Sequence, residues 1–220
     1  MILGLDTATP ATVVAVLPDD GEPVELRHEP GAGERPGHAT QLLPLARRAL
    51  EAVGATFADV RRIGVGVGPG TFTGLRIGVA TARALAQATG AELAPVSTLA
   101  ALAHAADDER AVLAVLDARR GEAFAAAHHG GEQLVAPVAV APEELADLAD
   151  PALAPWLAVG DGAVRFRDRL EPAAEVPADS SALHRVSALA VCRLAGTARI
   201  VDRDALLPDY VRAPDAVPRR

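Results

Sequence analysis

The sequence predicts an α/β protein of two lobes, each following the order strand, strand, strand, helix, strand, helix. The first observation is that residues 1–90 contain three short apolar strand patterns, an amphipathic helix, a Gly-rich strand and a long helix. The second is that a similar order, less complete, returns after the polar stretch ADDER at 106–110. We therefore predict a first lobe over 1–108 and a smaller second lobe over 109–220.

In the first lobe, the segments ILGLDT, TVVAVL and PVELRHE are separated by turn residues, which predicts an antiparallel meander. A helix is expected from about Thr40 to Val53, since Gly54 follows its end. The strand RRIGVGVG comes next, followed by a Gly-rich bend and the long helix. A strand at ELAPV and a helix from Ser97 to about Ala106 complete the lobe.

In the second lobe, three strands are expected at AVLAVLDA, EAFAAAHH and EQLVAPVAV, and the first two are joined at 119–121. Helices are expected over Pro142–Leu148, near Ala163–Leu170, and from Ser181 or Ala182 to Ala195. A strand at WLAVG lies between the first two of these helices. The element order of the first lobe is thus repeated with shorter elements.

Composition narrows the classes of function. The chain has 220 residues, is 50% hydrophobic, and carries a net charge of −8 with 21 cationic residues, all of them arginine. Without a lysine the Gly-rich bend cannot be a P-loop, and Schiff-base chemistry is excluded. An acidic balance argues against strong binding of nucleic acid by the chain alone. The start of the sequence has no basic n-region and no apolar run approaches roughly 18 residues, so we expect a cytoplasmic protein without membrane association.

The long helix after the Gly-rich bend is unusually apolar. Apolar and small residues cover roughly 260° of its wheel, more than one core needs, and Gly74, Gly78 and Ala82 repeat at the spacing that lets another helix approach. Two interpretations remain open: the two longest helices are simply core, or they also present a partner surface. The candidate partner interface comprises Leu42, Leu45, Ala46, Ala49, Gly74, Leu75, Arg76, Gly78, Val79, Ala82, Arg83 and Ala86.

Four motifs occur in order along nearly the whole chain: LGLDTATP, GVGPGTFTGLRIGVATARALA followed by PVSTLAALA, LDARRGEAF, and PDYVRAPDA. Together they resemble the bacterial TsaB family, also called YeaZ. The resemblance implies the two-lobed fold of the actin, Hsp70 and sugar-kinase (ASKHA) superfamily, with the second lobe reduced. It also implies a non-catalytic subunit that binds and activates TsaD, the enzyme that makes threonylcarbamoyladenosine in tRNA.

The resemblance further implies the partners. TsaD forms a heterodimer through the first two helices of the chain, TsaE binds the TsaB–TsaD pair, and the isolated chain forms a homodimer through the same face. Contact with tRNA is expected only indirectly. These implications favour the interface interpretation of the two apolar helices.

The resemblance also allows the metal-ligand positions of TsaD to be compared with this sequence. TsaD holds a metal with a His-x-x-x-His pair, and the matching positions here are Thr98 and Leu102, neither of which supplies an imidazole. His104 has no histidine four residues away, and the adjacent His128 and His129 point to opposite faces of a strand. We therefore predict no metal site and no catalytic residue, which leaves a metallopeptidase without chemical support.

The alternative function is a small-molecule kinase or ATPase of the same fold. The candidate residues for weak nucleotide contact are Asp6, Thr7, Thr9, Gly68, Gly70 and Thr71. A kinase also needs a second carboxylate, for which Asp117 is the natural candidate, although Asp6 and Asp117 can equally be turn formers. We expect the bend at 68–70 chiefly to turn the chain and to place the helix N-terminus, capped by Thr71 or Thr73, against the sheet. No tightly bound cofactor is expected, and ATP or ADP is at most weakly held at a partner interface.

Overall fold

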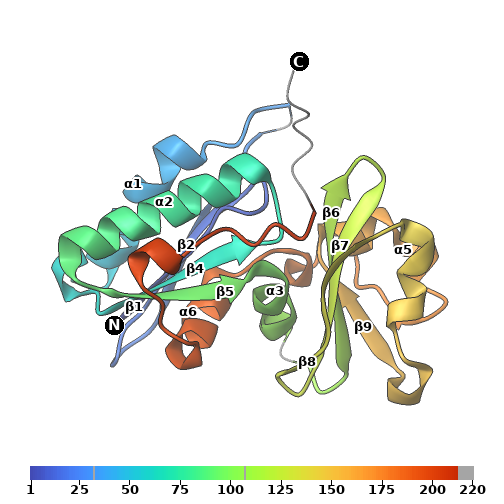
Figure 1. The fold of residues 1–220 in the computed structure, drawn as a ribbon. Helices are drawn as coiled ribbons and strands as arrows, with labels where there is room; N and C mark the ends of the chain where they lie inside the picture. Colours follow the sequence, from blue (N-terminus) through green and yellow to red (C-terminus); the bar gives the residue numbers. More distant parts are fainter. Residues whose placement is uncertain (32, 107, 213–220) are drawn as a thin grey trace.

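A computed structural model describes residues 1–31, 33–106 and 108–212, and it contains two five-stranded sheets, one in each lobe (Figure 1). The first sheet has the order β3-β2-β1-β4-β5 and consists of β1 (Ile2–Asp6), β2 (Thr12–Leu17), β3 (Val24–His28), β4 (Arg62–Gly68) and β5 (Glu92–Ser97). The second has the order β10-β9-β6-β7-β8 and consists of β6 (Ala111–Arg119), β7 (Glu122–His129), β8 (Glu132–Val140), β9 (Trp156–Val159) and β10 (Ala174–Glu175).

The second sheet repeats the topology of the first. In the first lobe β1 pairs antiparallel with β2 and parallel with β4, and in the second β6 pairs antiparallel with β7 and parallel with β9. The third strand of each lobe, β3 or β8, is antiparallel to the second. The predicted duplication of a βββαβα unit is therefore confirmed.

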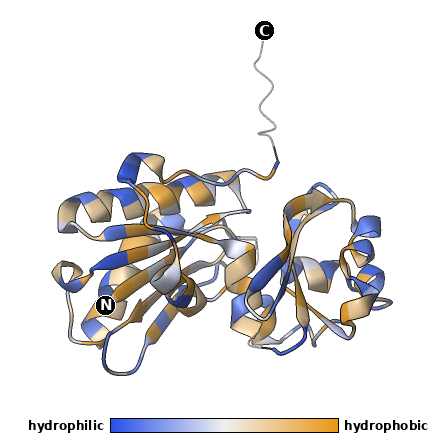
Figure 2. Cartoon of the chain, turned by 60° about the horizontal axis from the view of Figure 1, so that its bottom comes forward, coloured by the Kyte–Doolittle hydropathy of each residue, from blue (hydrophilic) through white to orange (hydrophobic). Residues whose placement is uncertain are grey.

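Helices cover both faces of the first sheet. Along one face lie α1 (His38–Ala52) and α2 (Phe72–Thr89), which pack side by side (Figure 1). Against the opposite face lies α6 (Ala188–Thr197), so close that a Cβ on Gly4 would be 2.6 Å from the Cys192 sulfur. Figure 2 shows hydrophobic and hydrophilic residues alternating along the helices, as expected for elements with one buried side.

The two lobes exchange helices. The helix α3 (Thr98–Ala106) follows β5 in sequence, but Leu99 and Leu102 lie in a core cluster with Val112 and Leu116 of β6. Conversely, α6 belongs to the second half of the chain and packs on β1, β2 and β4 of the first sheet. In the sequence, the strands of the first sheet precede residue 108 and those of the second sheet follow it. The segment from α6 onward, however, packs on the first lobe.

Of three helix predictions in the second lobe, the one over 142–148 is wrong and the other two are confirmed only in part. Residues 142–148 form two short 3₁₀ turns (Pro142–Glu144 and Ala146–Leu148), and 161–170 form two short helices, α4 (Asp161–Arg165) and α5 (Arg167–Leu170). The helix predicted from 181 to 195 is broken between a 3₁₀ turn at Ala182–His184 and the start of α6.

The break at 185–187 has a local cause. The hydroxyl of Ser181 accepts from the Leu183 N–H, and the hydroxyl of Ser187 accepts from the Ala190 N–H, so each serine caps its own turn or helix. Side-chain hydrogen bonds of this kind compete with helix continuation. At the start of α2, in contrast, Thr71 occupies the N-cap position but its side chain makes no capping bond.

In the described part of the chain, no helix combines the length and the apolar character needed to cross a membrane. Residues 213–216 of the motif PDYVRAPDA lie outside the described residues.

Candidate functional site

Most of the predicted interface residues lie inside the first lobe. The buried ones are Leu42, Leu45, Ala46, Ala49, Gly74, Leu75, Gly78, Val79 and Ala82. They contact the sheet and the facing helix of the same chain, so in the isolated chain these side chains are core, and their assignment to a partner interface stays a prediction. The apolar arc of α2 is wide because one side faces the sheet and another faces α1.

The glycines of α2 serve the hairpin between β1 and β2. A Cβ on Gly74 would lie 1.9 Å from the Thr7 carbonyl oxygen, and one on Gly78 would lie 2.5 Å from the Thr7 hydroxyl. The Thr7 hydroxyl donates a 2.7 Å hydrogen bond to the Gly74 carbonyl, and the Thr71 N–H donates one of 2.7 Å to the Ala8 carbonyl. These small residues therefore admit the chain's own hairpin rather than a partner helix.

A C-terminal segment covers one edge of α2. We call residues 200–212 the strap, and Figure 1 shows it in red, running along α2 toward the second lobe. The Val201 N–H donates to the Leu93 carbonyl, Leu206 is buried in the core of the first lobe, and the Asp209 N–H donates to the Val67 carbonyl. Sequence reasoning missed the strap, because it lacks the periodicity of a helix or strand.

The strap also binds two arginine side chains of α2, Arg76 and Arg83. Arg83 pairs with Asp204 at 2.8 Å, and the Arg76 Nε donates to the Tyr210 hydroxyl at 3.1 Å. The Arg76 guanidinium lies 3.8 Å from the centre of the Phe72 ring, which itself stacks on Tyr210. Two arginines named as candidate interface residues therefore bind the strap of their own chain.

A narrower surface of the two helices remains exposed, and we call it the outer face of α1 and α2. It consists of Leu43, Pro44, Ile77, Ala80 and Ala84; Ile77 is half-buried, and Leu43 is 48% exposed. Ala80 and Ala84, one turn apart, also border a groove of about 590 Å³ between α2 and the strap. These five residues are uncharged, but charged side chains surround them: Arg47 and Arg48 on α1, and Arg76, Arg83, Arg203 and Asp204 along the groove.

The candidate nucleotide residues do not converge on one cavity. Asp6 is completely buried, where it accepts hydrogen bonds of 2.8 Å from the Ala8 N–H and from the Thr98 hydroxyl. Thr7 and Gly68 are buried as well. Of the others, Thr9 lines one cavity, whereas Gly70 and Thr71 line another. The hairpin that would approach a phosphate is thus packed onto α2.

The second carboxylate that a kinase would need is paired. Asp117, at the end of β6, lies 3.2 Å from Arg119 and 2.6 Å from Arg165, and only 6% of its side chain is exposed. Its backbone N–H donates to Asp161, which begins α4 and does not cap it. Asp117 borders a cavity between the lobes, but Asp6 does not. The two carboxylates therefore do not face a shared site.

The burial of Asp6 predicts a pH dependence of folding. Desolvation raises the pKa of Asp6 from 3.8 to about 6, against the lowering effect of its two hydrogen bonds. Between these pH values the folded chain holds the proton more tightly than the unfolded chain, so the contribution of Asp6 to the free energy of unfolding falls as pH rises from about 4 to about 6. The loss amounts to roughly 3 kcal/mol.

Asp6→Asn should remove that part of the pH dependence, since its amide oxygen can still accept from the Ala8 N–H and its NH₂ can donate to the Thr98 hydroxyl. Denaturant unfolding of both proteins at several pH values measures the difference. The same slope in the variant and in the original protein would contradict the assignment.

The positions that match metal ligands in TsaD are used in the core. The Thr98 hydroxyl donates to Asp6, and Leu102 is buried against β6. His104, His128 and His129 border one cavity of about 350 Å³. No group of three or more His, Cys, Asp or Glu side chains within the described ranges is arranged to hold a metal ion.

Two sheets of identical topology with exchanged helices define a two-lobed α/β protein of the ASKHA class. The model of a family described as "TsaD: tRNA N6-adenosine threonylcarbamoyltransferase" matches residues 34–168. The solved structure of YeaZ from Pseudomonas aeruginosa superposes with a TM-score of 0.78 at 31% identity, covering 95% of this chain and 98% of that one.

Two curated relatives extend the comparison. The tRNA threonylcarbamoyladenosine biosynthesis protein TsaB of Escherichia coli is 32% identical over 169 residues, which are 73% of this chain and 71% of the relative. An uncharacterized protein of Mycobacterium tuberculosis is 33% identical over 224 residues, with coverage of 99% and 94%. The chain belongs to the TsaB (YeaZ) family.

Proposed function

We propose that this chain is a non-catalytic subunit of the machinery that makes threonylcarbamoyladenosine in tRNA, and that it binds and activates TsaD. Its membership of the TsaB family supports a role in this biosynthesis. The observation that carries the finer proposal is the outer face of α1 and α2, a set of apolar side chains on two adjacent helices that the chain itself leaves at least partly exposed.

The shape of this face suits a pair of partner helices. Small side chains at Ala80 and Ala84 let a partner backbone approach closely, and Leu43 offers an apolar side chain to insert between facing residues. Burial of such a patch is favourable because it removes apolar area from water. Arg47 and Arg48 at its border would fix orientation and speed association more than they add affinity.

A supporting rather than a catalytic role agrees with the chemistry of the interior. The two carboxylates that a phosphoryl transferase would direct at its substrate have partners within the chain. Asp6 is buried and hydrogen-bonded to Thr98, and Asp117 pairs with two arginines. The metal-ligand positions of TsaD are filled by Thr98 and Leu102. We propose that the chain works without a tightly bound cofactor, and that ATP or ADP is at most weakly held where it meets its partner.

The remaining parts of the proposal concern assembly. The isolated chain pairs with a second copy through the outer face of α1 and α2, TsaD replaces that copy, and TsaE then binds the TsaB–TsaD pair in the cytoplasm. Homodimer and heterodimer are mutually exclusive in this scheme because they use one surface.

Light scattering tests the scheme directly. The chain alone should have the mass of a dimer, and added TsaD should convert it into a species with one copy of each protein. Persistence of the homodimer beside free TsaD, over micromolar concentrations of both, would refute the proposed function.

A further inference from the structure

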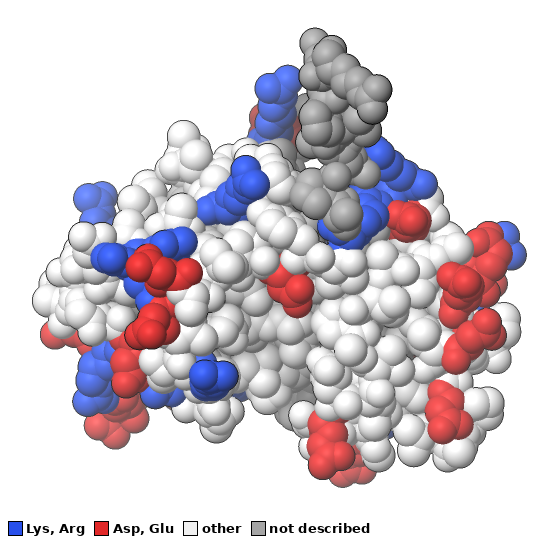
Figure 3. Space-filling model, in the orientation of Figure 1, with Lys and Arg blue, Asp and Glu red and all other residues white. Residues whose placement is uncertain are grey.

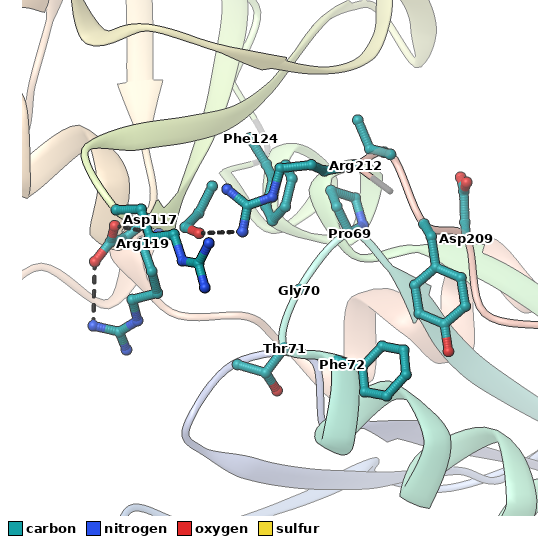
Figure 4. A pocket seen from close by; sticks show the side chains of 13 residues that line it. Pro69, Gly70, Thr71, Phe72, Asp117, Arg119, Phe124, Asp209 and Arg212 are labelled. Carbon is teal, nitrogen blue, oxygen red and sulfur yellow. Dashed lines mark hydrogen bonds and ion pairs between the residues drawn. The ribbon is translucent and has the colours of Figure 1, made fainter. Parts of the chain in front are cut away.

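A cavity of about 450 Å³ opens between the lobes, and none of the residues that line it belongs to the outer face of α1 and α2. Three segments that are distant in sequence meet there: the start of α2, the turn between β6 and β7, and the end of the strap. In Figure 4, Arg119, Phe124 and Arg212 stand on one side of the open space, and Thr71 and Phe72 stand across from them. Such a volume accommodates one nucleotide or a ligand of similar size.

Arginines gather at this opening although the protein is acidic overall. Arg119, Arg120 and Arg212 line the cavity, and Arg165 pairs with Asp117 at its edge. Figure 3 shows cationic side chains grouped at the upper end of the junction between the lobes. Asp117 and Asp209 also line the cavity, which offsets part of this charge.

The turn that carries two of these arginines has an unfavourable backbone conformation at both of them. Arg119 and Arg120 have φ values of 64° and 55°, in the left-handed region that glycine and asparagine occupy more easily. Tight hairpin turns require this conformation, and Asn-Gly or Gly-Gly would adopt it with less strain. The chain therefore carries two long cationic side chains at a position where smaller residues fit the backbone better. Arg119 pairs with Asp117 there, and 59% of its side chain remains exposed at the cavity.

Aromatic rings stand on the other side of the cavity. Phe72 and Tyr210 stack with their centroids 5.4 Å apart, yet they remain 42% and 37% exposed. Exposed aromatic side chains beside guanidinium groups are the combination on which unpaired bases stack while the phosphates meet the cations.

We propose that this cavity binds an unpaired nucleotide of an RNA, with the base against Phe72 and Tyr210 and a phosphate near Arg119 and Arg120. Of the candidate nucleotide residues, Gly70 and Thr71 line this cavity, whereas Asp6, Thr7, Thr9 and Gly68 do not, so the proposed site lies at the start of α2 and not at the hairpin between β1 and β2. The choice of RNA over a free nucleotide rests on the proposed function, in which this chain works beside a tRNA-modifying partner. The site replaces the expectation that tRNA is reached only indirectly.

The test uses the full chain and a fluorescein-labelled, unstructured RNA of about ten nucleotides, followed by anisotropy at about 50 mM salt, where phosphate contacts are strong. We expect saturable binding that Arg119→Glu weakens about tenfold and Tyr210→Ala about fivefold or more. Arg169→Glu is the charge-matched control, since Arg169 is an exposed arginine of the second lobe beside Glu143. It should bind the RNA as the original protein does.

Three outcomes would overturn the proposal: no saturable binding, unchanged affinity in both cavity variants, or an equal loss in the control, which would indicate non-specific charge. A competition experiment distinguishes a nucleotide within an RNA from a free nucleotide. AMP that displaces the RNA at equal nucleotide concentration would assign the cavity to free nucleotides and would also overturn it, whereas weak competition by AMP and by inorganic phosphate supports it.

Assembly with TsaD is measured separately, by light scattering on the Arg119→Glu chain. Because none of the residues that line the cavity belongs to the outer face of α1 and α2, this variant should assemble as the original does. RNA binding is measured on the chain alone, so a failure of assembly leaves its result intact, and a failure of RNA binding leaves the assembly result intact.

Discussion

Gly74→Ala is expected to destabilise the chain by roughly 3 kcal/mol or more, because an added methyl group has no space. Its Cβ would lie 1.9 Å from the Thr7 carbonyl oxygen and 2.5 Å from the Thr71 hydroxyl. The carbonyl cannot move alone, since the neighbouring Ala8 carbonyl accepts the Thr71 N–H at the start of α2. Relief of the clash therefore requires the hairpin and the helix to separate. Urea denaturation with a two-state fit measures the loss.

Gly196→Ala is the matched control. Gly196 also lies in a helix, but a Cβ there would meet only the Ile2 side chain, at an ordinary distance of 3.7 Å. Alanine is favoured over glycine in a helix by about 0.5–1 kcal/mol, so this variant should be as stable as the original protein or more stable. If both variants unfold at the same denaturant concentration as the original, the close approach of Thr7 to α2 is not a constraint on the fold.

The sheets and the long helices were predictable because their hydrophobic periodicity is strong. The antiparallel meander, the Gly-rich strand and both apolar helices fall within a few residues of their predicted places. The duplicated unit could be recognised from element order alone. Short elements were less predictable: the stretch from 181 to 195 reads as one helix, and only the hydrogen bonds of Ser181 and Ser187 divide it.

The sequence did not predict which segment of the chain packs against α2. Gly74 and Gly78 correctly signalled that a neighbour approaches α2 closely, but spacing alone does not distinguish another helix from the hairpin at Thr7. Arg76 and Arg83 were named as candidate interface residues, but their acceptors lie in the strap of the same chain, more than 100 residues away. Contacts between distant segments depend on the whole fold, and a local pattern does not contain them.

The burial of α2 changes how a partner interface can be tested. Variants at Gly78 or Val79 would disturb the core of the first lobe, because both residues are buried in it. Loss of binding in such variants would then report unfolding rather than a damaged surface. Substitutions at the exposed positions of the outer face of α1 and α2, such as Ala80 and Ala84, avoid this ambiguity because these side chains are not part of the core.

Ala84→Arg is the sharpest of these substitutions, and we expect it to weaken the association with TsaD by a factor of about 30 or more. Ala84 is exposed on the outer face of α1 and α2 and borders the groove beside the strap. An arginine there would hold a partner helix away from the backbone of α2. Its charge would also lose water in the interface, where Asp204 of the same groove is already paired with Arg83. Because the residue is exposed in the isolated chain, stability should be unchanged. Titration calorimetry with TsaD measures the affinity.

Ala152→Arg provides the control, since Ala152 is an exposed alanine of the second lobe, in the 3₁₀ turn Pro151–Leu153. It adds the same side chain and charge at a site remote from α1 and α2, so its affinity for TsaD should match that of the original protein. A homodimer built on the same face should dissociate in the Ala84→Arg variant and persist in the Ala152→Arg variant. Full affinity for TsaD in a folded Ala84→Arg chain would move the interface away from these helices, because no partner helix could pack there against an unpaired guanidinium.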